Sequence, residues 1–160
     1  MGGCTAAVED GETWVVEYEI SIDDRWLTRR AEVVGRSVTG TRSTVLESDG
    51  SGAWRVDGAP APNLAGCLDV DLESSAVTNT LPVHRLDLSA GRSRRAPAVY
   101  VRAVDLTAER LDQIYRRLPD TEDQQRYDYA APAFGFTAYL TYDETGLVID
   151  YPGIAHRFGR

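Results

Sequence analysis

Hydrophobic and polar residues alternate along most of the first third of the chain, a pattern typical of strands with one buried face. Residues 13–22 alternate most regularly, Asp23-Asp24 marks a turn, and residues 25–34 resume the pattern. The two runs together predict a hairpin. Residues 36–47 are rich in Thr, Val and Ser, which favours a further strand, and residues 49–52 (DGSG) predict the tight turn that follows it.

The second half of the chain shows the same alternation in shorter runs. Its clearest feature is a hairpin, in which residues 134–142 and 147–151 flank the turn signal of residues 143–146 (DETG). Shorter strands are predicted at residues 68–72, 86–88, 98–104 and 126–129. Strands are therefore expected in both halves.

Residues 107–118 fit both a helix and a strand. The first of them is a suitable helix N-cap, and apolar residues recur at helical spacing after it. As a strand, the same segment places Leu111, Gln113 and Tyr115 on one face. Because neighbouring strands can override weak local propensity, we favour a strand over residues 111–117.

About ten strands with at most one or two short helices predict an all-β protein. An open antiparallel sheet of that size rarely stays flat, so we expect it to be strongly curved or to form a partly open barrel. The chain has 160 residues, which suits a single domain over residues 1–160 with its own core.

The charge balance argues against one class of partner. All 17 basic residues are arginine, Asp and Glu total 25, and the net charge is −8. Binding to phosphate backbones requires a basic protein face, so we expect no nucleic-acid partner. No apolar run reaches the ~18 residues of a membrane helix, so we expect no membrane-spanning segment. The absence of an apolar leader favours a cytoplasmic location.

Cysteine and histidine are too few, and too far apart, for a recognisable metal site. Cys4, Cys67, His84 and His156 show no close ligand spacing, and neither a Gly-rich phosphate loop nor a G-x-S-x-G elbow occurs. We therefore expect no metal and no cofactor, and we interpret Cys67 as a small core residue.

The least generic segment of the chain runs from Trp54 to Leu86. Two alternating runs, residues 54–56 and 68–72, are separated by a break that is rich in Gly and Pro. A mixture of small, hydroxyl and amide residues follows at positions 75–82. A plain surface turn would not need that mixture, so we expect ligand contacts to come mainly from this segment.

Five segments, in order along the chain, resemble a bacterial and archaeal family described as putative glycolipid-binding proteins. They are residues 26–30 (WLTRR), 54–58 (WRVDG), 66–72 (GCLDVDL), 78–82 (TNTLP) and 146–153 (GLVIDYPG). The resemblance implies a mostly β, incompletely closed barrel similar to the lipoprotein localisation factors, whose hollow interior takes acyl chains. Family members usually have a strand before the region of Trp14. We expect this strand to be short or absent here. Its absence would leave one side of the barrel more open, or would reflect a start codon that was assigned too late.

Asp69 and Asp71 lie two residues apart on a predicted strand, so their carboxylates project from one face and Leu68, Val70 and Leu72 project from the other. Paired carboxylates serve glycosidic acid and base chemistry, whereas the plainer interpretation is a solvated strand face. Three aliphatic side chains are harder to leave in water than two aspartates. We therefore expect the aliphatic residues to face inward and the aspartates to lie outside or at a rim.

Asn79 and Thr80 are further candidates for ligand binding. They lie just before Leu81-Pro82, where the proline favours an extended backbone. The Asn79 amide can bind a sugar hydroxyl, or it can satisfy the backbone of its own loop.

Aromatic residues and one arginine complete the candidate ligand-binding set. Trp26, Trp54 and Tyr151 offer apolar planes with a polar edge, which suit stacking on sugars or flanking acyl chains. For Trp54, packing in the core is the favoured interpretation. Arg29 follows Trp26 closely and is a possible partner for the aspartates inside a barrel.

The leading hypothesis is non-catalytic binding of an amphipathic ligand, such as a glycolipid or another acylated molecule, in the cavity of a partly open β-barrel. It rests on the family resemblance, and the strand pattern and the absence of catalytic motifs agree with it. Two alternatives stay open. One is a hydrolase or lyase acting on a sugar-containing substrate through Asp69 and Asp71, and the other is a protein interaction scaffold that uses a sheet edge or an exposed patch.

Overall fold

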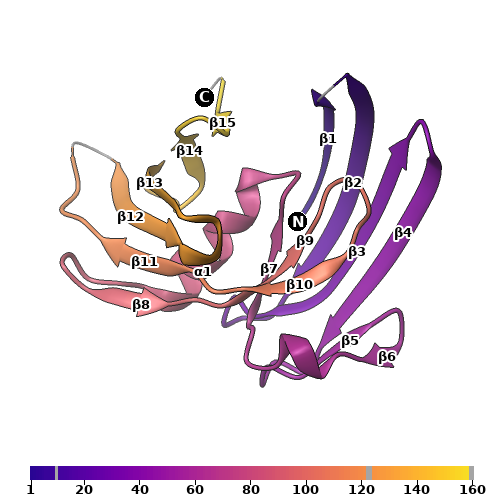
Figure 1. The fold of residues 1–160 in the computed structure, drawn as a ribbon. Coiled ribbons are helices and arrows are strands. Elements are labelled where there is room, and N and C mark those ends of the chain that lie inside the picture. Colours follow the sequence, from indigo (N-terminus) through magenta and orange to yellow (C-terminus); the bar gives the residue numbers. More distant parts are fainter. Residues whose placement is uncertain (10, 122–123, 159–160) are drawn as a thin grey trace.

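The computed structural model describes residues 1–9, 11–121 and 124–158. These residues form three sheets, one α-helix and three short 3-10 helices. Figure 1 shows the two six-stranded sheets on opposite sides of the molecule, with helix α1 (Thr80–Leu86) and strand β7 (Asp69–Leu72) between them. The prediction of an all-β fold that is curved and open is confirmed.

The first sheet follows the chain in order, so that each strand pairs antiparallel with the next. Its strands are β1 (Gly2–Glu9), β2 (Glu12–Ile22), β3 (Thr28–Ser37), β4 (Gly40–Ser48), β5 (Trp54–Val56) and β6 (Ala59–Pro60). Alternation decides the faces of β2, because Trp14, Val16 and Ile20 are buried while Glu17 and Glu19 are exposed. The first predicted hairpin is confirmed as β2 and β3.

Strand β1 contradicts the prediction that the strand before Trp14 is short or absent. It has eight residues and pairs with β2 along its whole length. Most of its residues are small, so hydrophobic alternation is hard to see in the sequence. Gly3 leaves room for the ring of Tyr18 on β2, since a Cβ at this position would lie 2.3 Å from the Tyr18 hydroxyl oxygen.

The second and third sheets contain the remaining strands. The second sheet has the order β10 (Ala108–Leu111), β9 (Ala98–Val101), β7. The third has the order β15 (Ala155–His156), β14 (Val148–Tyr151), β13 (Phe136–Tyr142), β12 (Gln125–Ala131), β11 (Ile114–Arg117), β8 (Ser93–Arg95). Among the described strands, only β7 and β9 pair in parallel, so the predicted antiparallel pairing holds elsewhere. The hairpin predicted around residues 143–146 is formed by β13 and β14.

The helical segments correct two predictions. The 3-10 helices are η1 (Pro62–Leu64), η2 (Ala76–Asn79) and η3 (Pro132–Phe134). η2 leads directly into α1, so the extended backbone expected before Pro82 is not found. Pro82 is the third residue of α1, where a backbone N–H would have no partner within the helix. The strand predicted at residues 86–88 is also wrong, because Leu86 ends α1 and packs beside the core of the third sheet.

Residues 107–118 do not form a helix. They contribute β10 and β11, which confirms strand over helix, but these are two strands in different sheets and not one strand over residues 111–117. No helix in the described ranges is long and apolar enough to cross a membrane.

Two hydrophobic cores meet at β7. The first packs the first and second sheets together and includes Val70, Leu72 and, as predicted, Cys67. The second belongs to the third sheet and α1. Every residue of β7 is buried, because Val70 and Leu72 face the first core while Asp69 and Asp71 face α1 and the start of β11.

Thr28 links the first sheet to β7 and gives a stability prediction. It is fully buried, its hydroxyl oxygen accepts a hydrogen bond from the Val70 N–H at 3.1 Å, and its own N–H donates to the Leu68 carbonyl at 3.1 Å. Thr28→Val keeps the shape but leaves the Val70 N–H without its acceptor. We expect the free energy of unfolding in urea to fall by about 1–3 kcal/mol.

The exposed Thr41 of β4 provides a matched control. Thr41→Val should change the free energy of unfolding by less than about 0.5 kcal/mol. Equal effects at the two positions would contradict a bridging role for Thr28.

Candidate functional site

A groove of about 830 Å³ lies between the two large sheets. One wall comes from β1 and β2 and includes Thr5, Ala7, Glu9 and Trp14. The opposite wall comes from the third sheet and includes Phe136, Val148, Ile149, Tyr151 and Ile154. The floor is formed by β7, η2 and the loop between them, together with Tyr100, Leu111 and Tyr129.

The walls of the groove are mainly apolar. Strand β1 contributes every second residue, as expected where one face of an edge strand borders a hollow. Three lining residues, Phe134, Leu147 and Ile154, are large hydrophobic side chains that remain 40–56% exposed, which places them at the open side. An apolar hollow with a few polar groups is the usual form of a small-molecule site.

Asp71 is the buried acid of the floor. Its Oδ1 accepts a hydrogen bond from the Thr78 hydroxyl at 2.8 Å, and its Oδ2 accepts one from the Gln113 amide at 2.6 Å. The Gln113 amide also donates to the Tyr129 hydroxyl at 2.9 Å, so the network reaches from β7 to β12. These hydrogen-bond partners are all uncharged, so none of them offsets a negative charge on Asp71.

The environment of Asp71 favours its neutral form. Burial raises the pKa of Asp71, the carboxyls of Asp69 and Glu73 add to the rise, and the hydrogen bonds from Thr78 and Gln113 oppose it. Burial and the nearby Asp71 also raise the pKa of the Tyr129 hydroxyl. The floor therefore presents groups that can both donate and accept hydrogen bonds.

Asp69 lies on the same face of β7 in different surroundings. Arg85 of α1 binds it through two nitrogens, with Nε to Oδ1 at 2.9 Å and Nη2 to Oδ2 at 2.5 Å. Burial raises the pKa of Asp69, and the ion pair with Arg85 opposes that rise. Asp69 does not line the groove, so the two carboxylates do not share a position in it.

The expectation that both aspartates lie outside or at a rim is wrong. Asp69 is 1% exposed and Asp71 is 8% exposed. A single-layer barrel would leave one face of β7 in water, but here α1 and the third sheet cover the face that carries the aspartates. Both faces of the strand are consequently buried.

Asn79 and Thr80 follow at the junction of η2 and α1. Asn79 borders the groove, and its amide nitrogen donates to the Tyr115 hydroxyl at 2.8 Å. Its carbonyl accepts a hydrogen bond from the Tyr142 hydroxyl at 3.3 Å, so the third sheet holds this residue firmly. Thr80 is fully buried and is not among the residues that line the groove.

Tyr151 is the third predicted site residue that the structure places at the groove, after Asp71 and Asn79. Its ring centroid lies 5.8 Å from that of Tyr129 and 5.9 Å from that of Phe136. Burial raises the pKa of the Tyr151 hydroxyl, so it keeps its proton. The cluster offers an apolar aromatic surface with hydroxyl groups at its edges.

Trp26 and Trp54 do not line the groove. Trp26 stacks on His84 of α1, with ring centroids 3.7 Å apart and planes 5° apart. Burial lowers the pKa of His84, which favours the neutral ring in this stack. Trp54 is buried in the first core, and its indole N–H donates to the Cys67 carbonyl at 2.8 Å. Both tryptophans connect separate segments of the fold.

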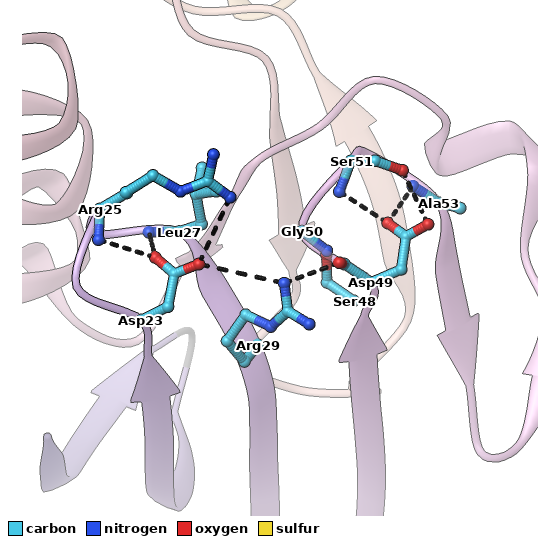
Figure 2. Close-up of polar contacts among 9 residues, drawn as sticks. All are labelled: Asp23, Arg25, Leu27, Arg29, Ser48, Asp49, Gly50, Ser51 and Ala53. Carbon is cyan, nitrogen blue, oxygen red and sulfur yellow. Dashed lines mark hydrogen bonds and ion pairs between the residues drawn. The ribbon is translucent and has the colours of Figure 1, made fainter.

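Arg29 connects two loops at one end of the first sheet, as Figure 2 shows. Its Nη1 donates to the Asp49 carbonyl at 2.7 Å and lies 4.0 Å from the Asp23 carboxylate. Both aspartates also accept backbone N–H groups of their own loops. Gly50 leaves space for the guanidinium, since a Cβ there would lie 1.8 Å from Nη1. Arg29 organises these loops and does not line the groove.

Several groove residues escape prediction from the sequence. Alternation shows that one face of a strand is buried, but it does not show whether that face packs in a core or lines a groove. Trp14 and Ile149 therefore look like ordinary core residues. Gln113, which does not line the groove but holds Asp71 there, does carry a signal, because its polar side chain occupies an inward position between Leu111 and Tyr115, where a buried amide needs partners. Those partners are distant in sequence and cannot be named from it.

The structure defines a class of open, all-β proteins in which two antiparallel sheets flank an apolar groove with a polar floor. Across the described ranges, no group of three or more His, Cys, Asp or Glu side chains is placed to hold a metal ion. The chain belongs to the family described as putative glycolipid-binding, whose sequence model matches residues 1–157, so the resemblance is confirmed.

One solved structure is similar over almost the whole chain. It is the crystal structure of a DUF1089 family protein from Pseudomonas aeruginosa, with a TM-score of 0.87 and 33% sequence identity. The match covers 98% of this chain and 92% of the other. No curated protein matches the chain.

The ion pair of Asp69 and Arg85 gives a second stability prediction. Arg85→Met leaves a buried carboxylate without its cation, so the free energy of unfolding should fall by about 3–5 kcal/mol. Combining it with Asp69→Leu removes both charges, and this double variant should recover most of the loss. Urea unfolding of both single variants and the double variant measures the coupling, and purely additive losses would argue against it.

The raised pKa of Asp71 predicts a pH dependence of stability. In the unfolded chain the carboxyl has its ordinary pKa of 3.8, so in the pH range above that value the folded state binds the proton more tightly. The stabilising contribution is complete below the ordinary pKa and is lost as the pH rises through the raised pKa. Relative to Asp71→Asn, which cannot titrate, the wild type should lose stability in urea unfolding as the pH rises above the ordinary pKa of 3.8. If the stability of the wild type relative to Asp71→Asn stays constant or rises with pH, the assignment of a raised pKa to Asp71 is refuted.

Proposed function

We propose that the chain binds an amphipathic ligand, such as a glycolipid or another acylated molecule, in the groove and performs no reaction on it. The observation that carries this proposal is a hollow of about 830 Å³ with apolar walls and a polar floor. Small-molecule sites typically have this composition and a volume of roughly 300–1,000 Å³. The family description supports the ligand class.

The apolar walls would supply most of the affinity. Burial of each methylene group contributes about 0.8 kcal/mol, so a chain of roughly ten methylenes gains about 8 kcal/mol before the cost of association. We further propose that the open sheets act as those of the lipoprotein localisation factors do, by admitting acyl chains between them.

The arrangement of the two aspartates gives little support to a hydrolase or lyase. Glycosidic acid and base chemistry uses two carboxyl groups on either side of one bond. Here Asp69 is held by Arg85, and only Asp71 borders the groove. A binding role requires no such pair.

Trp14 provides a direct test, because it lines the groove while Trp26 and Trp54 do not. An amphiphile with a brominated alkyl chain should quench the fluorescence of Trp14, since bromine quenches indole emission only at close range. Trp14→Phe should remove the quenching, and Trp26→Phe should keep it. Quenching that persists without Trp14 would place the ligand elsewhere.

A charge placed in the wall should block the ligand. Ile149→Asp introduces a carboxylate beside the expected acyl chain, so the affinity for the brominated amphiphile should fall by about tenfold or more. Val104→Asp is the matched control, since Val104 is exposed and does not line the groove. Equal affinities of the two variants would contradict the proposed site.

A further inference from the structure

The charges of the groove are unevenly distributed. Three carboxyl groups border it, those of Glu9, Asp71 and Glu73. Among the lining residues that the structure describes, the single cation is Arg157, and its Nη1 is bound to Asp143 at 2.7 Å. Glu73 also lies 3.9 Å from Nη2 of Arg102, which does not line the groove. Among the described lining residues, an anionic ligand would therefore meet more carboxyl groups than cations.

The floor of the groove carries buried hydrogen-bonding groups. At the floor, Asp71, Asn79 and the Tyr129 hydroxyl lie among hydrogen-bonded partners. At the open side, large hydrophobic lining side chains such as Phe134 are exposed, beside the exposed charged side chains of Glu9, Glu73 and Arg157. The buried hydrogen-bonding groups of the floor can contact the head of an amphiphile, and the exposed hydrophobic side chains at the open side can contact its apolar chain.

We infer that the floor receives the uncharged, hydroxyl-bearing head of an amphiphile and discriminates against an anionic head, with Asp71 as the specificity-determining residue. The inference rests on the proposed function, because it assumes that the groove is the ligand site. It adds the orientation of the ligand and the charge of its head.

The hydrogen-bonding capacity of Asp71 supports an uncharged head. Each of its carboxyl oxygens accepts one hydrogen bond from the protein, which leaves one further lone pair on each. A hydroxyl group both donates and accepts, so it can pair with this carboxyl in either protonation state. A phosphate or sulfate only accepts hydrogen bonds, so it cannot pair with an ionised Asp71, and a protonated Asp71 offers it a single donor. At short range its charge is also repelled by Glu73.

A cationic head is less well matched than a hydroxyl. It would need an ionised Asp71, whereas burial and the neighbouring carboxyls raise the pKa of this group. The surroundings of Asp71 therefore disfavour the ionised carboxylate that an ammonium head would need as its partner.

The test compares three amphiphiles with the same alkyl chain and different heads. The probes are dodecyl maltoside, dodecyl phosphate and dodecyltrimethylammonium, each titrated below its micelle concentration into the full chain and followed by calorimetry. We expect the maltoside to bind about tenfold or more tightly than the phosphate. Dodecyltrimethylammonium should bind more weakly than the maltoside.

Substitution of Asp71 tests whether this residue causes the preference for the uncharged head. Asp71→Asn keeps a polar side chain, cannot ionise and adds amide N–H donors from which a phosphate can accept, so the preference for maltoside over phosphate should shrink by about tenfold. Glu73→Gln, at an exposed lining position, should shrink it less and provides a second measurement if Asp71→Asn does not fold. Asp112→Asn is the control, since Asp112 is exposed and lies outside the groove, and it should leave the preference unchanged.

The outcomes separate this inference from the proposed function. Equal affinities for the maltoside and the phosphate, or tightest binding of the ammonium probe, would overturn the inference and leave groove binding intact. Failure of all three probes to bind would overturn both. A preference that is unaltered in Asp71→Asn and Glu73→Gln would remove the role of the floor carboxyls.

Discussion

Burial of β7 on both faces is the constraint on which the rest of the structure depends. Its aliphatic residues pack into one core, and its aspartates face α1 and the third sheet. Burying carboxyl groups is costly unless each finds hydrogen-bond partners. The helix inserted after β7 meets that need, because η2 supplies Thr78 and α1 supplies Arg85. The two sheets are thus held apart by a polar layer that also joins them.

The same layer explains why a groove exists. With α1 and β7 between them, the two large sheets cannot pack directly face to face or close into one barrel (Figure 1). The hollow therefore runs between edge strand β1 on one side and β14 and β15 on the other. The apolar faces that alternation gives to the strands form its walls, and the polar face of β7 forms part of its floor.

The fold was predictable where a pattern is local, and the site was not where it depends on tertiary contacts. Alternation and turn residues predict the hairpins of β2 with β3 and of β13 with β14. Strand β1 was underestimated because small residues such as Gly3 show no alternation. The facing of Asp69 and Asp71 was predicted wrongly because a single-layer barrel leaves one face of a strand in water, and nothing in the local sequence shows that a second layer covers β7.

Asp69 and Asp71 are chemically identical, and the difference between them bears on why an acid is retained at the groove. Asp69 has a guanidinium to offset its burial, and it is separated from the groove. Asp71 has only neutral hydrogen-bond partners, and it borders the groove. An apolar residue at position 71 would avoid the cost of burying a carboxyl group and would still fill the interior. Proteins commonly retain such locally unfavourable groups where function requires them. The position of the less compensated acid at the hollow therefore connects the energetics of the fold to ligand recognition.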